Sequence, residues 1–497
     1  MRFAIPQTHV RPPPLSPAAL LATLVMALPA SAAAASAVSA PPPPSRPTAL
    51  GALVQLPGTA GCVVDRSTPH RGCAPGRALR GPGPFLGSGA IVLDPKGANV
   101  YVASSRSNAI AIFRRDARSG RLTQSRGQAG CVAASGAGGC APALGLRGPN
   151  AVAVSPDGRS VYATSLRTNS LAVFRRDPGT GALTQARDGG GCLSGAATTG
   201  CRAARALNGP DAVAVSPDGR NVYVGSFVGN AVAVFARDRS TGALTQPAGA
   251  AGCVGGAPAD GCAPGLALGA PEGVAVSHDG ATVYVAAATS NAVAVLTREP
   301  STGALTQATD GTGCIVDQPL AGCTTGAQLG GANAVVVSPD DGTVHVTSLL
   351  SNSVTSFARA ATTGVLAQNA GTSGCVVFVL AIGCSLGRAM SAPEGLAVAP
   401  DGTGVYVAAF TSSAIAGFTR DTTTGALLQM RRRQGCLLAA APRDCTPARG
   451  LKGVSSVAIS ADGRQLYSVA FASNAVGVFQ RVTGAVTRSR SPEGNGP

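Results

Sequence analysis

Three acidic residues, Asp211, Glu272 and Glu394, are separated by multiples of one 61-residue step in the 497-residue chain. Asn150 and Asn333 occupy the same position in two further copies of the step. Oxygen-bearing side chains that converge from five consecutive copies form the kind of hard-ligand set that Ca²⁺ prefers. The same three carboxylates could act as a general base in hydrolysis. The alternative is that all five are polar turn residues in contact with water.

These positions belong to a unit that the chain repeats seven times. Residues 148–185 are GPNAVAVSPDGRSVYATSLRTNSLAVFRRDPGTGALTQ, and residues 209–246 are closely similar. A Val-Tyr pair, or its Val-His or Leu-Tyr equivalent, recurs at residues 100–101, 161–162, 222–223, 283–284, 344–345, 405–406 and 466–467. A constant step of this length indicates one structural module packed against its own copies.

Each unit carries four strand signals. AVAVS is apolar on both faces, as in a strand buried on both sides, and SPDG supplies a type I turn. VYVxS and NAVAVF are the next two strands, RDxxTG turns the chain, and ALTQ is a short fourth strand. One such sheet cannot bury both faces, so the units must pack on one another. We predict an all-β, seven-bladed β-propeller with four antiparallel strands per blade; an open solenoid, which would need polar capping units, is the alternative.

The N-terminal part of the propeller supplies a strand without a unit of its own. GALVQ at residues 51–55 precedes Cys62 by the same offset as GALTQ precedes Cys192. We therefore predict that this segment completes the seventh blade and closes the ring. The alternative is a local hairpin made by TGAVT at residues 483–487, because short loops close more readily than long ones.

Fourteen cysteines form seven pairs, one for each unit. They are Cys62 with Cys73, Cys131 with Cys140, Cys192 with Cys201, Cys253 with Cys262, Cys314 with Cys323, Cys375 with Cys384, and Cys436 with Cys445. An even count in an exported chain favours disulfides, and pairing within each unit is the simplest connectivity. Zinc is the alternative, but the spacing is wider than zinc sites use and no histidines accompany the pairs.

The cysteines lie in the long connection that follows the fourth strand. In an antiparallel meander this connection and the loop between the second and third strands emerge on one face, here called the Cys-loop face. Inserted loops on one face of a repeat array commonly form its binding surface. The five ring residues directly precede the first strand, so we expect them at the mouth of the central channel. Gly273 and Gly395, where most units have Ala, are expected to leave room for a ligand.

The units resemble the repeats of a known family. Residues 153–185, with the order SPDG…VY…NSLAVF, are similar to repeats of the lactonase-type seven-bladed β-propellers, a group that includes 6-phosphogluconolactonase and the YVTN propellers. The resemblance covers residues 48–488 and implies a lactone-hydrolysing enzyme or a secreted relative without that activity. It also implies a site with His, Glu and Arg near the channel. The candidates His70, His278 and His345 are expected elsewhere, in loops, turns or the core.

Two further sets recur with the step. The second strand ends at Ser105, Leu166, Phe227, Ala288, Leu349, Phe410 and Phe471, which either form an exposed apolar rim or cover the core between blades. The third strand ends at Arg115, Arg176, Arg237, Arg298, Arg359, Arg420 and Arg481, and an acid follows five of them. These arginines either bind an anion or pair across the following turn.

The ends of the chain and its charge suggest where the protein works. Residues 1–32 have the basic start, the apolar run and the small-residue site of a signal peptide, although a retained anchor is an alternative. We predict a Pro/Ala-rich linker at 33–47, the propeller at 48–488 and a flexible tail at 489–497. A net charge of +16, almost all from arginine, favours contact with anionic polymers. The absence of Trp argues against a carbohydrate-stacking platform.

We predict a secreted or cell-surface monomer that binds an unknown small molecule or surface polymer through the Cys-loop face. The first alternative is a lactone or ester hydrolase with Asp211, Glu272 and Glu394 at the channel mouth, assisted by Ca²⁺. The second is a structural cell-surface module. Nucleic acid is not an expected partner, and no motif such as GxSxG, HExxH or a phosphate-binding loop is present.

Overall fold

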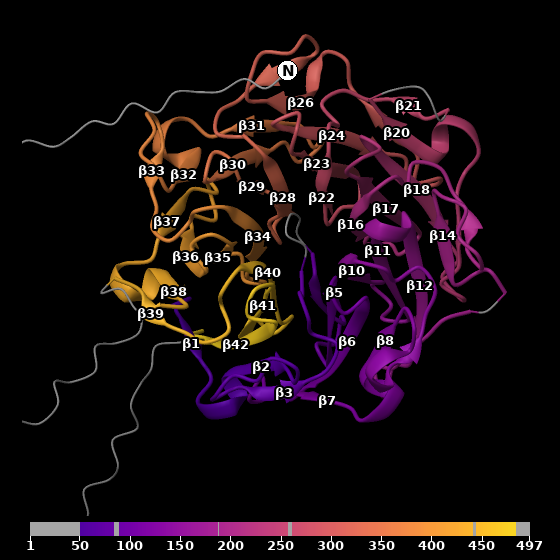
Figure 1. The fold of residues 1–497 in the computed structure, drawn as a ribbon. Helices are drawn as coiled ribbons and strands as arrows, with labels where there is room; N and C mark the ends of the chain where they lie inside the picture. The colour runs from indigo at the N-terminus through magenta and orange to yellow at the C-terminus, as the bar shows by residue number, and fades with distance from the viewer. Residues whose placement is uncertain (1–49, 84–88, 187, 257–260, 441–443, 484–497) are drawn as a thin grey trace, which may run out of the picture. The chain divides into compact units, whose positions relative to one another are not determined.

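Seven β-sheets surround one axis, and the first strand of each sheet is the innermost (Figure 1). The computed structural model describes residues 50–83, 89–186, 188–256, 261–440 and 444–483, so the predicted signal peptide, linker and tail lie outside the described residues. The innermost strands are β4 (Ile91–Leu93), β10 (Pro149–Val154), β16 (Pro210–Val215), β22 (Pro271–Val276), β28 (Ala332–Val337), β34 (Pro393–Val398) and β40 (Val454–Ile459). Each contacts the next, and β40 contacts β4. The ring is therefore closed, and the seven-bladed propeller is confirmed.

The second and third strands of each blade carry the VY and NAVAVF patterns. The second strands are β5 (Asn99–Ser104), β11 (Ser160–Ser165), β17 (Asn221–Ser226), β23 (Thr282–Ala287), β29 (Thr343–Ser348), β35 (Gly404–Ala409) and β41 (Gln465–Ala470). The third strands are β6 (Ala109–Arg115), β12 (Ser170–Arg176), β18 (Ala231–Arg237), β24 (Ala292–Arg298), β30 (Ser353–Arg359), β36 (Ala414–Arg420) and β42 (Ala475–Arg481). Both sets are almost wholly buried, because each sheet is covered by its neighbours on both sides.

The outer edge of each blade is more elaborate than the predicted single fourth strand. Two separate pieces pair with the third strand, and the second piece begins near the first cysteine. These pieces are β1 (Leu53–Gln55) with β2 (Cys62–Asp65), β7 (Leu122–Gln124) with β8 (Cys131–Ala133), β13 (Leu183–Thr184) with β14 (Cys192–Ser194), β19 (Leu244–Thr245) with β20 (Cys253–Gly255), β25 (Leu305–Gln307) with β26 (Gly311–Val316), β31 (Leu366–Gln368) with β32 (Cys375–Val377), and β37 (Leu427–Gln429) with β38 (Cys436–Leu438). Short 3₁₀ turns join the pieces in most blades, at Gly58–Gly61, Gly127–Gly130, Gly249–Gly252, Gly371–Ser373 and Arg432–Gly435.

A further strand, the last of the six in each sheet, pairs in parallel with the second piece. These strands are β3 (Ala74–Gly76), β9 (Ala141–Pro142), β15 (Arg202–Ala203), β21 (Ala263–Pro264), β27 (Cys323–Thr325), β33 (Ser385–Leu386) and β39 (Thr446–Pro447). The prediction of four antiparallel strands was therefore wrong in detail, since each sheet has six strands and one parallel pair.

The disulfides explain the parallel pair, because each one holds the returning chain beside the piece that it has just left. Cys62 is bonded to Cys73, Cys131 to Cys140, Cys192 to Cys201, Cys253 to Cys262, Cys314 to Cys323, Cys375 to Cys384, and Cys436 to Cys445. The predicted pairing within each unit is therefore confirmed for all fourteen cysteines. The zinc alternative is wrong, because none of these cysteines is left as a free thiol.

The N-terminal segment closes the ring. β1 pairs with β42, with Leu53 opposite Arg481, and β2 pairs with β42 farther along the same edge. The seventh blade thus contains β40, β41 and β42 from the C-terminal part and β1, β2 and β3 from the N-terminal part. The predicted closing strand is confirmed, and the position proposed for the C-terminal hairpin is occupied.

The ring of arginines at the ends of the third strands links neighbouring blades. In one example, Arg298 donates from Nε to the Tyr223 hydroxyl (2.8 Å) and from Nη2 to Asp218 Oδ2 (2.7 Å), both in the preceding blade. Equivalent ion pairs are Arg115–Asp462, Arg176–Asp94, Arg237–Asp157, Arg359–Asp279, Arg420–Asp340 and Arg481–Asp401. The prediction of pairing with the following acid was wrong. Those acids cap their own turns, as Asp177 does for the Thr180 backbone N–H, while the arginines bind an aspartate that follows the first strand of the preceding sheet.

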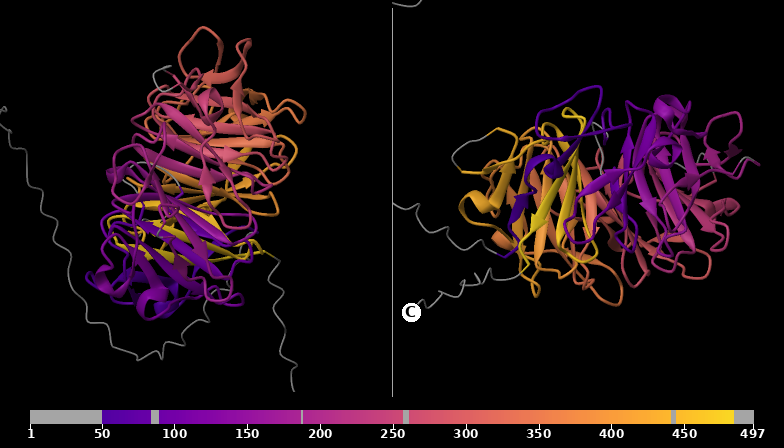
Figure 2. Two further views of the ribbon diagram at one scale, coloured as in Figure 1. Left: turned by 90° about the vertical axis from the view of Figure 1, so that its right-hand side faces the viewer. Right: turned by 90° about the horizontal axis from the view of Figure 1, so that it is seen from below.

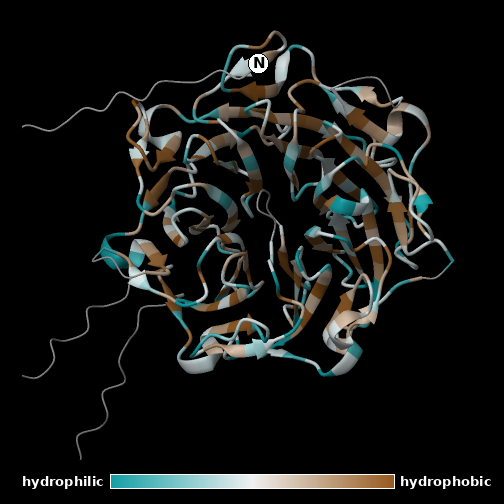
Figure 3. Cartoon of the chain, in the orientation of Figure 1, coloured by the Kyte–Doolittle hydropathy of each residue, from teal (hydrophilic) through white to brown (hydrophobic). Residues whose placement is uncertain are grey.

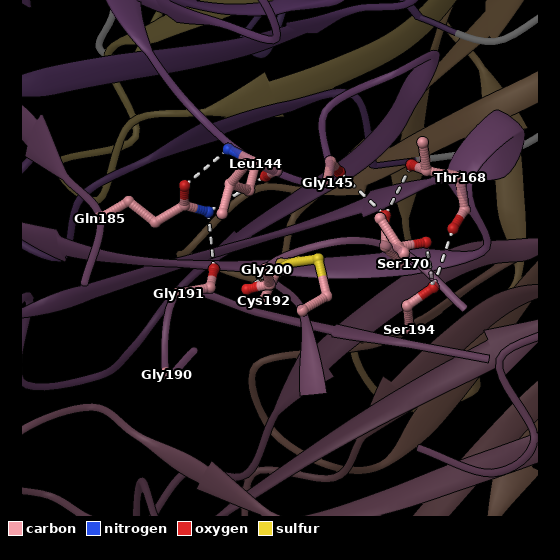
Figure 4. The surroundings of a disulfide bond; sticks show 12 residues. Leu144, Gly145, Thr168, Ser170, Gln185, Gly190, Gly191, Cys192, Ser194 and Gly200 are labelled. Atoms are coloured by element: carbon pink, nitrogen blue, oxygen red, sulfur yellow. Dashed lines mark hydrogen bonds between the residues drawn. A yellow bond between two sulfur atoms is a disulfide. The ribbon is translucent and has the colours of Figure 1, made fainter. Parts of the chain in front are cut away.

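A second link uses the glutamine of ALTQ. Gln185 Oε1 accepts from the Leu144 backbone N–H (2.7 Å), and its Nε2 donates to the Leu144 carbonyl (3.1 Å) and to the Gly191 carbonyl (2.6 Å), next to the Cys192 disulfide (Figure 4). Leu144 belongs to the preceding blade, so each glutamine ties one blade's cysteine-bearing connection to the next blade. The strands run between the two faces of the ring (Figure 2), and hydrophobic residues, brown in Figure 3, predominate along them. Their side chains are buried. Among the described residues, no helix combines the length and apolar character needed to cross a bilayer.

His345 is the one position where the Tyr of the inter-blade link is replaced, and it is buried as predicted. Arg420 Nε donates to Thr343 Oγ1 instead (3.0 Å). Burial lowers the pKa of His345 to about 3. Because the folded-state pKa is below the unfolded value, its contribution to stability is present above about pH 6.5 and is lost as the pH falls towards 3.

We expect His345→Tyr to raise the free energy of unfolding at pH 7 by about 1–2 kcal/mol. A tyrosine hydroxyl there would form the hydrogen bond with Arg420 that the equivalent tyrosine forms with its arginine in the other six blades. The substitution should also reduce the loss of stability between pH 6.5 and 3. Chemical denaturation of the wild type and the variant at pH 7 and pH 4 would measure both effects. A variant that is less stable at pH 7, with unchanged acid sensitivity, would contradict this account of the link.

Candidate functional site at the channel mouth

The five ring residues lie inside the innermost strands, at β-bulges. The register of β16 against β17 shifts between Pro210 and Ala212, so Asp211 is the extra residue. The same shift surrounds Asn150, Glu272, Asn333 and Glu394 in β10, β22, β28 and β34. The prediction that they directly precede the strand was therefore wrong by one or two residues. A bulge redirects one side chain at the end of a strand, and here the shift occurs in six consecutive blades, the sixth around Ser455 in β40.

The ring residues are buried rather than immersed in water. Asp211, Glu272 and Glu394 are 4%, 3% and 1% exposed, and the two asparagines are equally hidden. The interpretation as hydrated turn residues is thus wrong. Burial raises the pKa of Asp211 to about 7. Burial, with the Asp211 charge, raises the pKa of Glu272 to about 8, and burial with both other carboxylates raises the pKa of Glu394 well above its usual value. The three carboxyl groups therefore lie within electrostatic range of one another.

The asparagines and the acids differ in their hydrogen-bond partners. Asn333 Oδ1 accepts from Thr347 Oγ1 (2.8 Å), and its Nδ2 donates to the Pro393 carbonyl (3.0 Å). Asn150 donates to Asp211 Oδ1. By contrast, Asp211 Oδ2 and Glu394 Oε2 are buried and have no partner in the part of the chain that the structure describes. Buried polar atoms are nearly always hydrogen-bonded, so these oxygens are available to a ligand.

Residues on the second strand explain this difference, and the sequence interpretation missed them. Opposite the two asparagines the second strand has Thr164 and Thr347, whereas opposite the three acids it has Gly225, Ala286 and Ala408. The threonine hydroxyls bond to the bulge: Thr164 Oγ1 accepts from the Ala151 N–H (3.1 Å) and donates to the Asp211 carbonyl (3.2 Å). The acids face small residues without polar groups. The alternation of Thr with Asn and of Gly or Ala with acid was a usable signal in the aligned units.

The glycines after the two glutamates do not make room for a ligand. A Cβ on Gly273 would lie 2.8 Å from the Asn333 carbonyl oxygen, and one on Gly395 would lie 2.6 Å from the Ser455 carbonyl oxygen. The glycines instead allow the next innermost strand to approach closely. A cavity of about 160 Å³ does lie on the axis, lined by Ala212, Val274, Val335, Leu396 and their neighbours in the innermost strands. Most of its lining residues are apolar, but polar atoms contribute as much of its surface as apolar ones.

An apolar rim surrounds the ring on the Cys-loop face. Its members directly follow the second strands and bond to the chain just before the ring residues, as the Phe227 N–H does to the Gly209 carbonyl (2.8 Å). Leu166 is 41% exposed, and its companions are partly exposed. Phe410 and Phe471 are 6.5 Å apart between ring centres, and the Arg106 guanidinium lies 4.2 Å above the Phe471 ring. Of the two predictions for this set, the structure favours the exposed rim.

The calcium site stays a prediction, whereas the three histidines lie away from the channel, as expected. No group of three His, Cys, Asp or Glu side chains in the described ranges is close enough to hold a metal ion. Calcium at Asn150, Asp211, Glu272, Asn333 and Glu394 would therefore need amide oxygens as well, and it stays a prediction. His278 lies in an exposed turn beside Asp341, and His70 is exposed on a connection. With His345 in the core, none of the three lines the channel cavity.

Glu272 gives the site a distinctive pH dependence. Since its folded-state pKa is raised from about 4.5 to about 8, stability is greatest below pH 4.5 and falls as the pH rises to 8. We expect Glu272→Gln to remove this loss, so that the variant gains about 3–5 kcal/mol relative to the wild type between pH 4 and pH 9. Urea unfolding across this range measures the gain. The exposed residue Glu299 supplies the control Glu299→Gln, and equal behaviour of the two variants would contradict the burial argument.

Comparison with known proteins concerns the fold and does not identify a reaction. The sequence model of the family described as lactonase, seven-bladed β-propeller, matches residues 139–247 and 191–321. No curated protein shows a significant sequence match to the chain. A Pseudomonas aeruginosa periplasmic gluconolactonase has 17% identity and a TM-score of 0.49, covering 81% of this chain and 97% of its own. Kuenenia stuttgartiensis hydrazine synthase has 17% identity and a TM-score of 0.48 with the same coverage.

A Lactobacillus plantarum protein is similar at 20% identity and a TM-score of 0.48, over 74% of this chain and 86% of its own. At such values the solved structures carry no argument about activity. The family match and the seven closed sheets agree independently with the resemblance inferred from the repeats. The chain is therefore a seven-bladed β-propeller whose repeats, over residues 139–321, match those of the lactonase propeller family.

Proposed function

We propose that this propeller is an exported binding protein that holds a small organic ligand at the channel mouth on its Cys-loop face. The observation that carries the proposal is the pair of buried carboxyl oxygens, on Asp211 and Glu394, without hydrogen-bond partners among the described residues. Leaving a buried polar group unpaired costs about 1–3 kcal/mol. The Ser455 hydroxyl, at the ring position of the seventh blade, also lacks a partner among the described residues. Three such groups in one ring are expected where a ligand supplies the missing partners.

The raised pKa values define which ligand groups fit. With a pKa raised to about 8, Glu272 is mainly protonated near pH 7, so it can donate one hydrogen bond and accept others. Burial raises the pKa of Glu394 in the same direction. A ligand hydroxyl or carbonyl suits such groups. An anionic ligand would gain no ion pair there, because a protonated carboxyl group carries no charge. The apolar rim, with Phe227, Leu349 and Phe410, would cover the hydrophobic part of the same ligand. We infer a neutral, amphipathic molecule with a compact polar end.

Calorimetric titration with neutral lactones and with polyols of matched size tests this proposal. We expect a neutral lactone with an apolar substituent to bind, and Glu394→Met to weaken its binding at least about tenfold, because methionine keeps the length of the side chain but has no O–H donor and no carbonyl acceptor. The exposed residue Glu299, which directly follows β24 and does not line the axial cavity, supplies the control Glu299→Gln. If Glu394→Met and Glu299→Gln bind the lactone alike, the ring is not the site.

Hydrolysis of a lactone is the second candidate, and the family match favours it. Asp211, with a pKa of about 7, would take a proton from the attacking water. Glu272, with a pKa of about 8, would give its proton to the departing ring oxygen, so the acyl carbon–oxygen bond breaks and a hydroxy acid forms. Carboxyl groups whose surroundings set different pKa values are typical of acid–base pairs.

The disulfides and the N-terminal sequence both support export. Seven disulfides persist in oxidising compartments, and the sequence of residues 1–32 has the pattern of a signal peptide. We propose a secreted or cell-surface location for the propeller. The mass of the protein recovered outside the cell would show whether cleavage follows the small-residue site at 30–32, and a full-length product in the cytosol would refute export.

A further inference from the structure

A second groove lies far from the channel, at the junction where the ring closes. It runs between the outer strand β3 of the seventh blade and β7 of the first blade, and its volume is about 490 Å³. Four arginines line it: Arg66, Arg77, Arg121 and Arg126. No Asp or Glu is among its described lining residues. The groove is therefore a concentrated positive site on the outer edge of the propeller.

The repeat does not require arginine at three of these positions. Where this unit has Arg121, the other six have Ala or Val, at residues 52, 182, 243, 304, 365 and 426. Arg126 has an arginine equivalent in two units, at residues 187 and 431, but alanine at residues 248 and 370. Arg66 corresponds to alanine at residues 196, 257 and 440. Because sister units fold with alanine at these positions, the repeat does not need Arg66, Arg121 or Arg126 for its structure, unlike the arginines that link neighbouring blades.

The four side chains divide into one fixed and three available cations. Arg77 Nη2 donates to the Ser125 and Gly127 carbonyls (2.9 Å each), which holds its guanidinium in the groove. Arg66, Arg121 and Arg126 are exposed, and their side chains form no hydrogen bond or ion pair with other described residues. The nearest acid along the chain, Asp65, is buried and accepts from the Leu79 backbone N–H (2.9 Å). Asp116, the acid nearest in sequence to Arg121, accepts instead from the Ser119 backbone N–H and hydroxyl (2.7 Å each).

A sister groove shows the difference. Between β15 and β19 a cavity of about 670 Å³ is lined by Arg202 and Arg205. Both of these arginines are engaged, since Arg202 donates to the Leu244 carbonyl (2.7 Å) and Arg205 donates to the Pro247 carbonyl (3.0 Å). Ala248 lies in this lining where the first groove has Arg126. The two grooves share their architecture, but only the first of the two presents uncommitted guanidinium groups.

We propose that the groove between β3 and β7 binds an anion with several contiguous phosphate groups. The guanidinium fork matches phosphate oxygens in a bidentate manner. Four guanidiniums around one groove favour a multivalent anion over a single phosphate, because each further phosphate adds a pairing. The site is independent of the channel mouth, whose carboxyl groups would repel such a ligand if ionised.

Calorimetric titration of the full chain with inorganic tripolyphosphate tests the proposal. We expect one site per chain, an affinity that falls with added salt, and binding at least about tenfold tighter than that of orthophosphate. The triple variant Arg66→Ala, Arg121→Ala, Arg126→Ala should bind tripolyphosphate at least about tenfold more weakly. It should still fold, because sister units carry alanine at each of the three positions.

The matched control removes three exposed arginines that directly follow turns between the first and second strands and do not line the groove. Arg159→Ala, Arg220→Ala, Arg464→Ala changes the net charge equally, and two sister units have Ala98 and Ala281 there. We expect less than about a twofold change in tripolyphosphate affinity. Equal weakening in both triple variants would show attraction by net charge alone and would overturn the proposal, as would the absence of binding to the wild type. Conversely, Ala243→Arg with Ala248→Arg should create a second site in the sister groove.

Discussion

Replacing Arg298 by methionine is expected to lower the free energy of unfolding by about 3 kcal/mol, since removing one partner of a buried ion pair leaves the remaining acceptors without their hydrogen bonds. Arg298 is 4% exposed and binds Tyr223, Asp218 and the Gly280 carbonyl (3.0 Å). Methionine keeps the apolar length of the side chain but satisfies none of these acceptors. Guanidinium-induced unfolding of the intact, oxidised protein would measure the loss.

Arg220→Met is the matched control for this prediction, because Arg220 is exposed and lies in an SPDG turn of the same ring face. We expect it to change stability by no more than about 0.5 kcal/mol. If both variants lose the same stability, the inter-blade ion pairs do not hold the ring together. A second position, Arg115→Met, tests closure itself, since Arg115 joins the first blade to Asp462 of the seventh.

Glu272→Gln is expected to reduce the turnover of a hydrolysed lactone at least about 100-fold, because a general acid contributes typically 10²–10⁴-fold to the rate. In the wild type, Asp211 must be ionised and Glu272 protonated, so the pH profile should be bell-shaped with limbs near 7 and 8. Glu272→Gln should remove the alkaline limb. Initial rates across this pH range would show both effects.

The control for activity is Glu299→Gln, which removes an exposed glutamate far along the same blade from the channel mouth. Unchanged rates in this variant and a loss in Glu272→Gln would assign hydrolysis to the ring. Full activity in Glu272→Gln would exclude this acid–base assignment. A wild type without turnover that still binds the lactone would leave the binding proposal in place and remove the hydrolase.

Much of the fold was accessible from the sequence, because seven copies in one register repeat every strand and turn signal. The ring, the pairing of the cysteines and the closing strand at residues 53–55 all followed from that register. The broken fourth strand did not follow, because its two pieces are separated by a short 3₁₀ turn that has no strong sequence signal. The partner of each arginine was also missed, since the following acid is close in sequence while the bound aspartate lies in the preceding blade.

The candidate site was predicted by position but not by environment. The equal spacing of Asp211, Glu272 and Glu394 indicated one ring. Their burial arises from β-bulges, and a bulge inserts a residue without changing the apolar pattern on either side of it. The alternation of Thr347 and Ala286 opposite asparagine and acid carries that information, but it has meaning only when the second strand is known to face the bulge.

The central claim is that the channel mouth contains buried carboxyl groups that remain protonated near neutral pH. Infrared spectroscopy of the carbonyl stretch of carboxylic acids measures this directly. At pH 7 the account predicts a protonated carboxylic acid band in the wild type, weaker in Glu272→Gln and absent when Glu394→Gln and Asp211→Asn are added. A wild-type spectrum at pH 7 with ionised carboxylates alone would contradict the account.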